Sequence, residues 1–454
     1  MEIVLYDGVS TVGGCKFMIR TKETSIFLDF GRNYARESSY FLEPIMSARD
    51  YKILRDLNII PDVKGLYKGT GEKPSVDGIF ISHAHSDHYG YIRYVKDDVP
   101  IYLGETALSL IMAREAASQP PKAEYAISRF IDGKIEPLKK FNGFRTGSQV
   151  KIGDLTVKPV HVDHSVPGSY GFIVDDGEST VAYTGDYRLH GAVSDLTRDF
   201  IREAASSEPD LMLVESTHIT ECRLGSEFEV RSKLDKIFES TKGLIAVGIG
   251  ELDLDRLKSM FFSASRAGRE LVIPLRTAFI IYIVSSDPKL RMPHIEDIKI
   301  YVKEKRRYRR FERFILGKLE DKGLEPVSSE YVSKNQRSTV MVANYYHMGE
   351  LARIKPMSGS VYILSSTEPF NEESEMRYER LQEWLRFLGV PMYLLHASGH
   401  ADALDIRYLV EGVKPRVVTP VHTEGSRVFE KFVQVEGVQV RCAREGETIS
   451  TLGR

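Results

Sequence analysis

The sequence predicts a layered α/β protein with a second, regularly alternating α/β region in its middle. Two observations support this prediction. Short runs of apolar, β-branched residues bounded by Gly, Asp or Ser recur through the first half of the chain, which is the pattern of strands. Helical patterns such as Ala107–Ser118 and Ser194–Ala205 lie between them. Short strands with helices between them are typical of sheets that are covered by helices.

The strand pattern of the first half is regular enough to place each run. The expected strands are Glu2–Tyr6, Lys16–Ile19, Ser25–Leu28, Gly78–Ile81, Ile101–Leu103, Gln149–Ile152, Leu155–Pro159, Tyr170–Val174, Thr180–Thr184 and Leu211–Val214. Each is bounded by residues that favour turns, so we expect the runs to be separate strands of one or more sheets.

From about residue 227 the pattern becomes a regular alternation of helix and strand, which favours an open parallel sheet. The first segments are Glu227–Ser240, Gly243–Val247, Asp253–Ala267 and Glu270–Pro274. Later come a strand, an acidic helix and two further strands, at Ser360–Leu364, Asn371–Leu388, Met392–Leu395 and Arg416–Pro420.

Length and composition set broad limits. A chain of 454 residues predicts about three domains of ~150 residues, or two with one of them large. Hydrophobic residues make up 42% and charged residues 28%, which excludes a disordered chain, a fibrous repeat and a disulfide scaffold. A net charge of −2 excludes polyanion binding by bulk charge and leaves a local basic patch open.

The chain is expected in the cytoplasm. Its three cysteines stand alone without a CxxC pair, which fits a reducing compartment. The first residues have neither the basic segment nor the apolar segment of a signal peptide. The most apolar run, Thr277–Val284, is far shorter than the roughly 20 residues that span a bilayer, so we expect no membrane partner.

The strongest chemical signal is the sequence ISHAHSDHYG at the end of a predicted strand. It contains His83, His85, Asp87 and His88. Residues two apart leave a strand on the same side, so His83 and His85 can bind one ion. The following turn directs Asp87 and His88 towards a second ion. Nitrogen and oxygen ligands of this kind suit zinc or manganese.

Two metals need further ligands, including one that bridges them. The candidates lie at the ends of later predicted strands, and they are His161, His164, Asp186 and His422. Taken alone, each of them could equally be a structural residue of a loop.

The order of these motifs resembles the metallo-β-lactamase superfamily. Three further matches, Glu215 in VEST, His400 in HASGHA and His422 in PVHTE, resemble the extra motifs of the β-CASP nucleases, the branch that contains ribonuclease J and the factor that cuts pre-mRNA 3′ ends. The resemblance implies a four-layer αββα sandwich with an inserted α/β β-CASP domain. It divides the chain into residues 1–220, 221–370 and 371–454, the first and last forming the metallo-β-lactamase domain.

The resemblance also implies a role for each site residue. One metal would be held by His83, His85 and His164. The other would be held by Asp87, His88 and His422. Asp186 would bridge them, and Asp29 in FLDFG would support the ligand loops. His161 is expected to be an ordinary strand residue.

The implied reaction is hydrolysis of a phosphodiester by a hydroxide that two divalent ions activate, zinc or manganese. His400 would protonate the leaving 3′ oxygen, and Glu215 would keep His400 protonated. Asp87 is counted with these two as a catalytic residue.

The resemblance favours RNA over DNA as the substrate. The DNA-processing β-CASP enzymes have Val at the motif where this chain has His422. The stretch Lys299–Gly323 holds ten Lys or Arg against four Asp or Glu, interleaved with Tyr and Phe. It would bind RNA, expected to be single-stranded, or it would form a solvated amphipathic helix with Phe311, Phe314 and Ile315 in the core.

A second resemblance concerns direction of cleavage. The serine-rich turn and the HxSGH loop of ribonuclease J receive a terminal 5′ phosphate. The matching residues are Ser365, Ser366, Thr367, His396 and Ser398. Thr367 and Glu368 depart from the serine-rich form. These matches favour a 5′-to-3′ exonuclease, with an endoribonuclease of the cleavage-factor type as the alternative.

Other functions stay open at this point. They are a DNA nuclease, a non-nucleolytic hydrolase such as a thioesterase or lactonase, and an inactive RNA-binding subunit. The chain ends at Arg454, soon after His422, as in the compact archaeal ribonuclease J-like proteins. The oligomeric state is open, a homodimer being one alternative.

Overall fold

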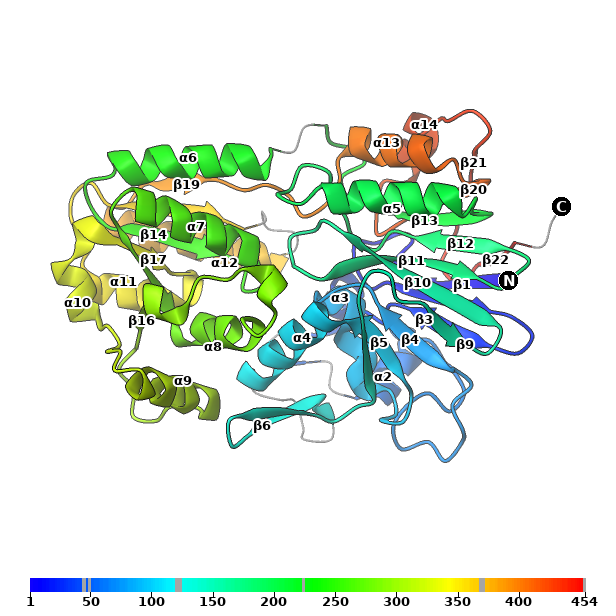
Figure 1. Cartoon of the computed structure of the whole chain (residues 1–454), viewed down its shortest axis with the longest axis horizontal. Coiled ribbons are helices and arrows are strands. Elements are labelled where there is room, and N and C mark those ends of the chain that lie inside the picture. The colour runs from blue at the N-terminus through cyan, green and yellow to red at the C-terminus, as the bar shows by residue number, and fades with distance from the viewer. Residues whose placement is uncertain (43–45, 48–49, 119–124, 223–224, 367–371, 452–454) are drawn as a thin grey trace. The chain divides into compact units, whose positions relative to one another are not determined.

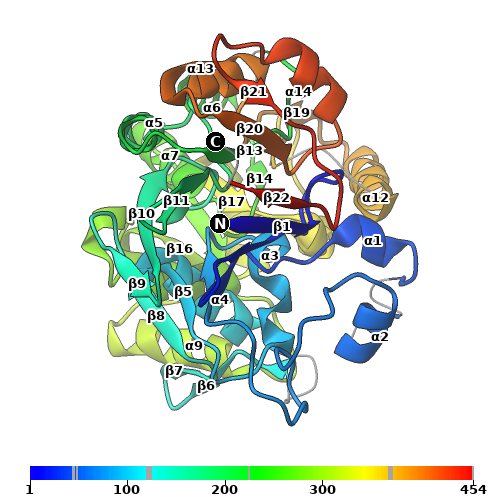
Figure 2. The ribbon, with the colours of Figure 1, turned by 90° about the vertical axis from the view of Figure 1, so that its right-hand side faces the viewer.

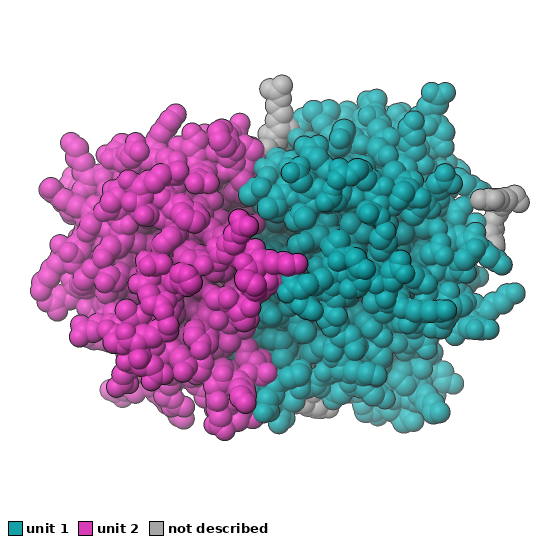
Figure 3. All heavy atoms as spheres, viewed as in Figure 1, with its two compact units in different colours: residues 1–129, 136–224, 399–454 teal, residues 130–135, 225–398 magenta. Residues whose placement is uncertain are grey.

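The computed structural model describes residues 1–42, 46–47, 50–118, 125–222, 225–366 and 372–451. The chain divides into two compact units, which Figure 3 colours separately. The first unit comprises residues 1–129, 136–224 and 399–454, and the second comprises residues 130–135 and 225–398.

The first sheet of the first unit has seven strands in the order β22-β1-β2-β3-β4-β5-β8. Their bounds are β1 Glu2–Asp7, β2 Lys16–Arg20, β3 Ser25–Leu28, β4 Gly78–Ile81, β5 Ile101–Gly104, β8 Phe141–Phe144 and β22 Thr448–Ser450. Strands β3, β4, β5 and β8 are parallel to one another. Their carboxyl ends therefore lie at one edge of the sheet.

The second sheet of this unit also has seven strands, in the order β21-β20-β13-β12-β11-β10-β9. Their bounds are β9 Val150–Ile152, β10 Leu155–Val162, β11 Ser169–Asp175, β12 Thr180–Tyr183, β13 Leu211–Glu215, β20 Val417–Val421 and β21 Gln439–Val440. β12, β13 and β20 run parallel, so their carboxyl ends also share an edge.

The two sheets pack face to face through one apolar core. Phe17, Ile26 and Phe80 of the first sheet belong to the same buried cluster as Val157 and Phe172 of the second. A second cluster joins the other face of the second sheet to α5 Asp195–Ser206, α13 Ala403–Val413 and α14 Ser426–Phe432 (Figures 1 and 2). The other face of the first sheet carries α2 Tyr51–Asp56 and α4 Glu105–Ala117 (Figure 1). The expected αββα sandwich is thus confirmed.

Short elements complete this part of the chain. They are α1 Tyr34–Ser38, α3 Ser86–Tyr89, the 3-10 helix Gly90–Tyr94 and the two-stranded ribbon of β6 Ser128–Ile131 and β7 Lys134–Pro137. Among the described residues, no helix has both the length and the apolar character needed to cross a membrane.

The second unit is built on a parallel sheet of six strands in the order β16-β15-β17-β14-β18-β19. The bounds are β14 Ile245–Ile249, β15 Glu270–Pro274, β16 Lys299–Tyr301, β17 Thr339–Val342, β18 Val361–Ser365 and β19 Met392–Leu394. The helices are α6 Glu227–Ser240, α7 Leu254–Arg266, α8 Leu275–Val284, α9 Arg310–Asp321, α10 Ser329–Lys334, α11 Met348–Ile354 and α12 Glu372–Leu388. This is the open parallel sheet that the alternation predicts.

The second expected boundary, between residues 370 and 371, falls inside this unit. β19 follows it in the chain and pairs in parallel with β18, and Leu381 and Leu385 of α12 are part of the unit's buried core. The chain therefore leaves the second unit only after Ser398.

The basic stretch Lys299–Gly323 forms three structures in turn. Strand β16 comes first, an exposed loop follows, and α9 ends the stretch. Phe311 and Ile315 of α9 are buried in the core as the alternative reading expects, and Phe314 is partly buried.

Candidate metal centre

The predicted ligands all follow strands of the first unit. His83 and His85 lie in the turn between β4 and α3, and Asp87 and His88 lie in the short helix α3 itself. His164, Asp186 and His422 lie within three residues of the ends of β10, β12 and β20. Because the two sheets pack against each other and several of these strands share a carboxyl edge, residues far apart in the sequence converge there.

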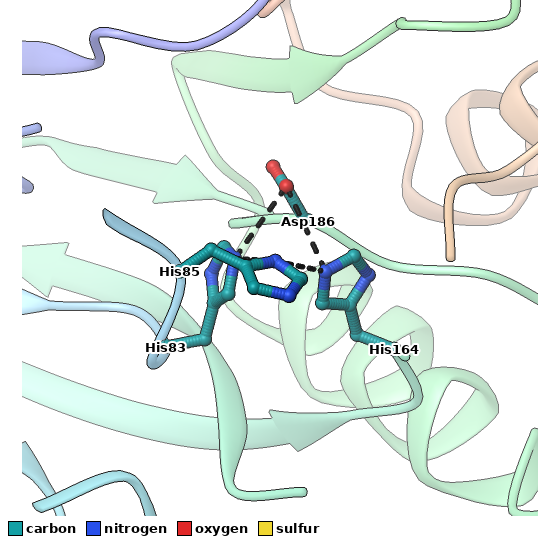
Figure 4. Close-up of side chains that lie close together, drawn as sticks. All are labelled: His83, His85, His164 and Asp186. Atoms are coloured by element: carbon teal, nitrogen blue, oxygen red, sulfur yellow. Dashed lines mark hydrogen bonds and ion pairs between the residues drawn. The ribbon is translucent and has the colours of Figure 1, made fainter. Parts of the chain in front are cut away.

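One group of possible ligands consists of His83, His85, His164 and Asp186, whose donor atoms all lie within 4.8 Å of one another (Figure 4). His85 Nδ1 is 3.1 Å from both His83 Nε2 and His164 Nε2. Asp186 Oδ2 lies 3.6 Å from His83 Nε2 and 3.8 Å from His164 Nε2. Three imidazoles and a carboxylate around one point are a typical site for a divalent transition metal.

The second group surrounds the same Asp186 oxygen. Oδ2 of Asp186 lies 3.2 Å from His88 Nε2 and 3.9 Å from His422 Nε2. Asp87 Oδ2 is 3.2 Å from His422 Nε2 and 3.7 Å from His88 Nε2. The seven residues expected to bind metal are therefore all brought together, with Asp186 common to both groups.

The donor set fits a metal, because its central atoms are buried without the hydrogen bonds that buried polar atoms need. Both carboxylate oxygens of Asp186 and the Nε2 atom of His88 have no hydrogen-bond partner among the described residues. A buried carboxylate without donors is costly unless a cation compensates its charge.

Hydrogen bonds on the far side of the rings direct four histidines into the centre. His83 Nδ1 is 3.0 Å from Ser82 Oγ, and His88 Nδ1 donates to Asp29 Oδ2 at 2.7 Å. His164 Nδ1 donates to the Gly399 carbonyl at 2.5 Å, and His422 Nδ1 is 2.8 Å from Thr217 Oγ1. With Nδ1 occupied, each ring presents Nε2, as metal-binding histidines usually do. His85 is the exception and presents Nδ1.

Burial keeps three of these rings in the neutral form that binds metal. It lowers the pKa of His83 and His164 well below their usual range, and it lowers the pKa of His85 to about 4. Burial acts against the charge of Asp186, but the imidazoles of His422 and His88 hold its pKa well below the ordinary value. Burial also acts against the charge of His88, but the carboxylates of Asp186 and Asp29 raise its pKa well above the ordinary value. The centre therefore offers three neutral imidazoles and an ionised carboxylate, with His88 as the ring that favours a proton.

Asp29 is hydrogen-bonded to the start of the ligand turn. It adopts the left-handed conformation with a φ of 59°, and its side chain accepts hydrogen bonds from the Ser82 amide at 2.7 Å, the Ser82 hydroxyl at 2.8 Å and the Tyr183 hydroxyl at 2.7 Å. Tyr183 was not found from the sequence, because it is one of several tyrosines in apolar strands.

His400 lies at the same centre, with its side chain 18% exposed. Its Nδ1 atom is 3.5 Å from Glu215 Oε1 and 3.7 Å from Asp186 Oδ2. Burial works against the imidazolium, but the carboxylates of Glu215 and Asp186 raise the pKa of His400 to about 9. His400, Asp186 and His422 also form a possible ligand group, so the geometry permits His400 as an acid or as a ligand.

Glu215 and Thr217 connect this histidine to the metal ligands. Glu215 is fully buried and accepts hydrogen bonds from the amides of Ala401 at 3.2 Å and Thr217 at 2.9 Å. The Thr217 hydroxyl donates to Glu215 Oε2 at 2.9 Å and lies 3.3 Å from His400 Nδ1. Sequence reasoning missed Thr217. Its one signal was its place two residues after Glu215 in VEST.

Two further residues complete the surroundings. His161 lies inside β10 and stacks on Tyr170, so the expectation of an ordinary strand residue is confirmed. Cys15, which the sequence did not single out, lies with His88 and His422 in a third possible ligand group. Burial and the nearby Asp29 raise the pKa of the Cys15 thiol, which keeps it protonated and a poor ligand.

The residues expected to bind a terminal phosphate lie in the second unit, at the carboxyl ends of β18 and β19. Ser365 is fully buried, donates to the Leu395 carbonyl at 2.6 Å and accepts a hydrogen bond from Arg256. Ser366 and His396 are partly buried and Ser398 is buried. Thr367 lies outside the described residues. The structure thus brings the ends of the two strands together at Ser365 and Leu395.

Comparisons with known proteins agree with this architecture. Residues 65–239 match the family described as beta-lactamase superfamily domain, and residues 392–442 match the family described as Zn-dependent metallo-hydrolase RNA specificity domain. Ribonuclease J 2 of Streptococcus pyogenes serotype M3 is 23% identical over 93% of this chain and 70% of its own length. Ribonuclease J of Sinorhizobium meliloti is 22% identical over 82% of this chain and 61% of its length.

A solved structure shows the same fold along the whole chain. The crystal structure of a protein of unknown function from Enterococcus faecalis V583 superposes with a TM-score of 0.76 and 20% identity, covering 99% of both chains.

Two packed sheets with a His and Asp cluster at their strand ends define a metallohydrolase of the metallo-β-lactamase type. The RNA specificity match and the ribonuclease J relatives narrow this class. The chain thus carries a beta-lactamase superfamily domain and an RNA specificity segment, and it is ribonuclease J-like over most of its length.

Gly31 sets a packing constraint on the ligand turn. A Cβ atom at Gly31 would lie 1.5 Å from the Asp87 carbonyl oxygen. We expect Gly31→Ala to lower the free energy of unfolding by about 1–3 kcal/mol and to weaken metal binding, since the Asp87–His88 backbone must move. Gly317→Ala is the control, because Gly317 lies within α9 with open space around its Cβ position and should be stabilised by up to about 1 kcal/mol. Denaturant unfolding of both variants tests this, and an unchanged Gly31→Ala protein would contradict it.

Proposed function

We propose that this protein, a metal-dependent ribonuclease, hydrolyses RNA phosphodiesters at a centre that holds two divalent ions, zinc or manganese, and that it degrades RNA from the 5′ end. The observation that carries the proposal is the position of Asp186. Its Oδ2 atom lies within 4 Å of His83, His88, His164 and His422, and both its oxygens lack hydrogen-bond donors among the described residues. A single carboxylate in this position can bridge two ions.

The proposed ligands are divided between two positions. His83, His85 and His164 would hold one ion, and Asp87, His88 and His422 would hold the other, with Asp186 shared. When bound, two such ions lower the pKa of water and stabilise negative charge on phosphoryl oxygens. Asp29, Ser82 and Thr217 contribute by fixing the ring orientations, so that the ligands need little rearrangement.

His400 is the proposed general acid for the leaving 3′ oxygen. Bound cations would offset the negative charge of Asp186. Glu215 then remains as the carboxylate that favours the protonated form of His400. Glu215 is held in place by the Ala401 and Thr217 amides, so the Glu215 and His400 pair is positioned before substrate arrives. Asp87 would act beside them as a metal ligand, and its carboxylate would neutralise part of the charge of the bound ion.

The metal stoichiometry tests the bridging role. We expect about two divalent ions per chain by elemental analysis, and Asp186→Asn should lose both ions and all cleavage, since one change affects both groups of ligands. The control is Asp195→Asn at the exposed first turn of α5, which should keep both ions. A fully active Asp186→Asn protein would overturn the two-metal proposal.

The acid role predicts a different pattern for His400. His400→Ala should retain both ions and cleave roughly 10²–10⁴-fold more slowly, the usual effect of losing a general acid. Glu215→Gln should slow cleavage less, because the imidazole remains. Loss of one ion in His400→Ala would instead identify His400 as a ligand.

A 5′-to-3′ direction is supported by the carboxyl ends of β18 and β19. Ligands of open parallel sheets bind at this edge. Ser366, His396 and Ser398 lie there, and we propose with Ser365 and Thr367 that they receive the terminal 5′ phosphate. Arg256, which forms a bidentate ion pair with Glu227, holds Ser365 and the Leu395 carbonyl together beneath them. A 5′-monophosphate offers more charge and more acceptor oxygens than an internal phosphate.

RNA with different 5′ ends tests the direction. Wild-type protein should release mononucleotides from 5′-monophosphorylated, single-stranded RNA faster than from its 5′-hydroxyl twin. Ser366→Ala with Ser398→Ala should reduce this preference while Ser286→Ala, at an exposed serine after α8, leaves it intact. Discrete internal fragments at equal rates from both RNAs would favour an endoribonuclease instead.

We also propose that the protein acts in the cytoplasm. The structure contains three free cysteines, at positions 15, 222 and 442. Free thiols persist in a reducing compartment.

A further inference from the structure

A cationic loop in the second unit is not used by the mechanism above. Residues 303–310, which we call the basic loop, follow the carboxyl end of β16 and end at the first residue of α9. They contain six Lys or Arg and one Glu. All but the partly buried Tyr308 are exposed. This concentration of charge stands out in a chain whose net charge is −2.

The conformation of the basic loop is fixed by the acidic side chains around it. Lys303 Nζ is 3.3 Å from Glu350 Oε1, and Lys305 Nζ is 2.6 Å from Glu312 Oε1. Glu312 also accepts a hydrogen bond from the Arg309 amide at 2.7 Å, and Lys305 lies over the Tyr308 ring. Two lysines thus anchor the loop to the helices.

Three arginines of the basic loop keep their charge unneutralised. Arg306, Arg307 and Arg310 have no carboxylate within 4.0 Å among the residues that the structure describes. Glu304, the one acidic residue of the loop, is exposed and forms no ion pair with any residue that the structure describes. Uncompensated arginines on a fixed loop favour binding of phosphate groups.

A pair of tyrosines lies beside the basic loop. β16, β15 and β17 are parallel neighbours, so the turn after β17, residues 344–347, lies at the same edge of the sheet as the basic loop. The contact between Lys303 and Glu350 of α11 joins the two, because α11 begins directly after this turn. Tyr346 is 70% exposed, and its ring centroid is 5.6 Å from that of Tyr345.

We infer that the basic loop and Tyr346 form a binding surface for the body of single-stranded RNA, with the arginines contacting phosphates and the tyrosine stacking on an unpaired base. This inference rests on the proposed function. Basic side chains next to an exposed aromatic ring are the usual combination for unpaired nucleic acid. The loop offers no exposed Leu, Ile, Phe or Trp that a membrane surface would require.

The sheet order separates this surface from the proposed phosphate pocket. β16 is four strands away from β18, which corresponds to about 19 Å at ~4.8 Å per strand. RNA whose 5′ end lies at β18 and β19 must therefore extend along the carboxyl edge to reach the basic loop. The surface should strengthen binding of long RNA and leave a dinucleotide unaffected.

Binding of RNA at several salt concentrations tests the arginines. The probe is a fluorescein-labelled 20-nucleotide oligouridylate with phosphorothioate linkages, which resist hydrolysis, added to the full-length metal-loaded protein. We expect R306E/R307E/R310E to weaken binding about a hundredfold at 0.1 M salt and to reduce the slope of log K against log[salt] by about 2, since three phosphate contacts contribute ~0.7 each. The matched control is R231E/K233E/K236E, three exposed cations on α6, which Figure 1 shows on the opposite side of this unit from α9.

Tyr346 should behave differently from the arginines. Tyr346→Ala should weaken binding roughly 5- to 100-fold with an unchanged salt slope, and Tyr346→Phe should restore it, because stacking needs the ring and not the charge. Tyr408→Ala, at an exposed position of α13, is the control. Duplex RNA of the same length should gain nothing from Tyr346, because its bases are paired.

The outcomes separate this inference from the proposed function. If R306E/R307E/R310E binds the 20-nucleotide probe as tightly as the α6 control while wild-type protein cleaves RNA, the surface is overturned and the ribonuclease stands. If wild-type protein neither binds nor cleaves RNA, the proposed function fails. Thermal unfolding of all variants, with R306Q/R307Q/R310Q as a milder substitution, shows whether a binding loss comes from misfolding.

Discussion

A buried carboxylate without a hydrogen-bond donor is the constraint on which the rest of the first unit depends. Among the described residues Asp186 has imidazole nitrogens near it and no donor, so its charge needs cations for compensation. The turn after β4, the ends of β10 and β20 and the His400 segment all converge on this one oxygen. Packing of the two sheets brings the strand ends together, and the carboxylate of Asp186 gives the histidines of several loops one common partner.

The outer hydrogen bonds set the orientation of the ligand rings. Asp29 accepts hydrogen bonds from Ser82, Tyr183 and His88 at once, which joins the two sheets directly beneath the ligands. Thr217 connects Glu215, His400 and His422 in the same way on the other side. The rings of His83, His88, His164 and His422 are therefore oriented by the protein, which limits their rotational freedom.

The sequence predicted what local patterns encode and missed what only tertiary contact creates. Three histidines and an aspartate in six residues identified the ligand turn, and alternation of helix and strand identified the parallel sheet of the second unit. Thr217 and Tyr183 act through partners far away in the chain, so no periodicity marks them. The boundary after Ser398 was missed for the same reason, because α12 and β19 join the second unit through contacts with β18 and its core.

The distribution of charge decides what a nearly neutral chain can bind. The basic stretch was open to two readings because its composition fits both a phosphate-binding loop and an amphipathic helix. The structure divides it at the start of α9, where Phe311 and Ile315 are buried and the preceding arginines are exposed. Acidic partners such as Glu312 and Glu350 neutralise the lysines that anchor the basic loop and leave Arg306, Arg307 and Arg310 available. A net charge of −2 is then compatible with binding a polyanion, because attraction at ~10 Å range depends on the local surface and not on the total.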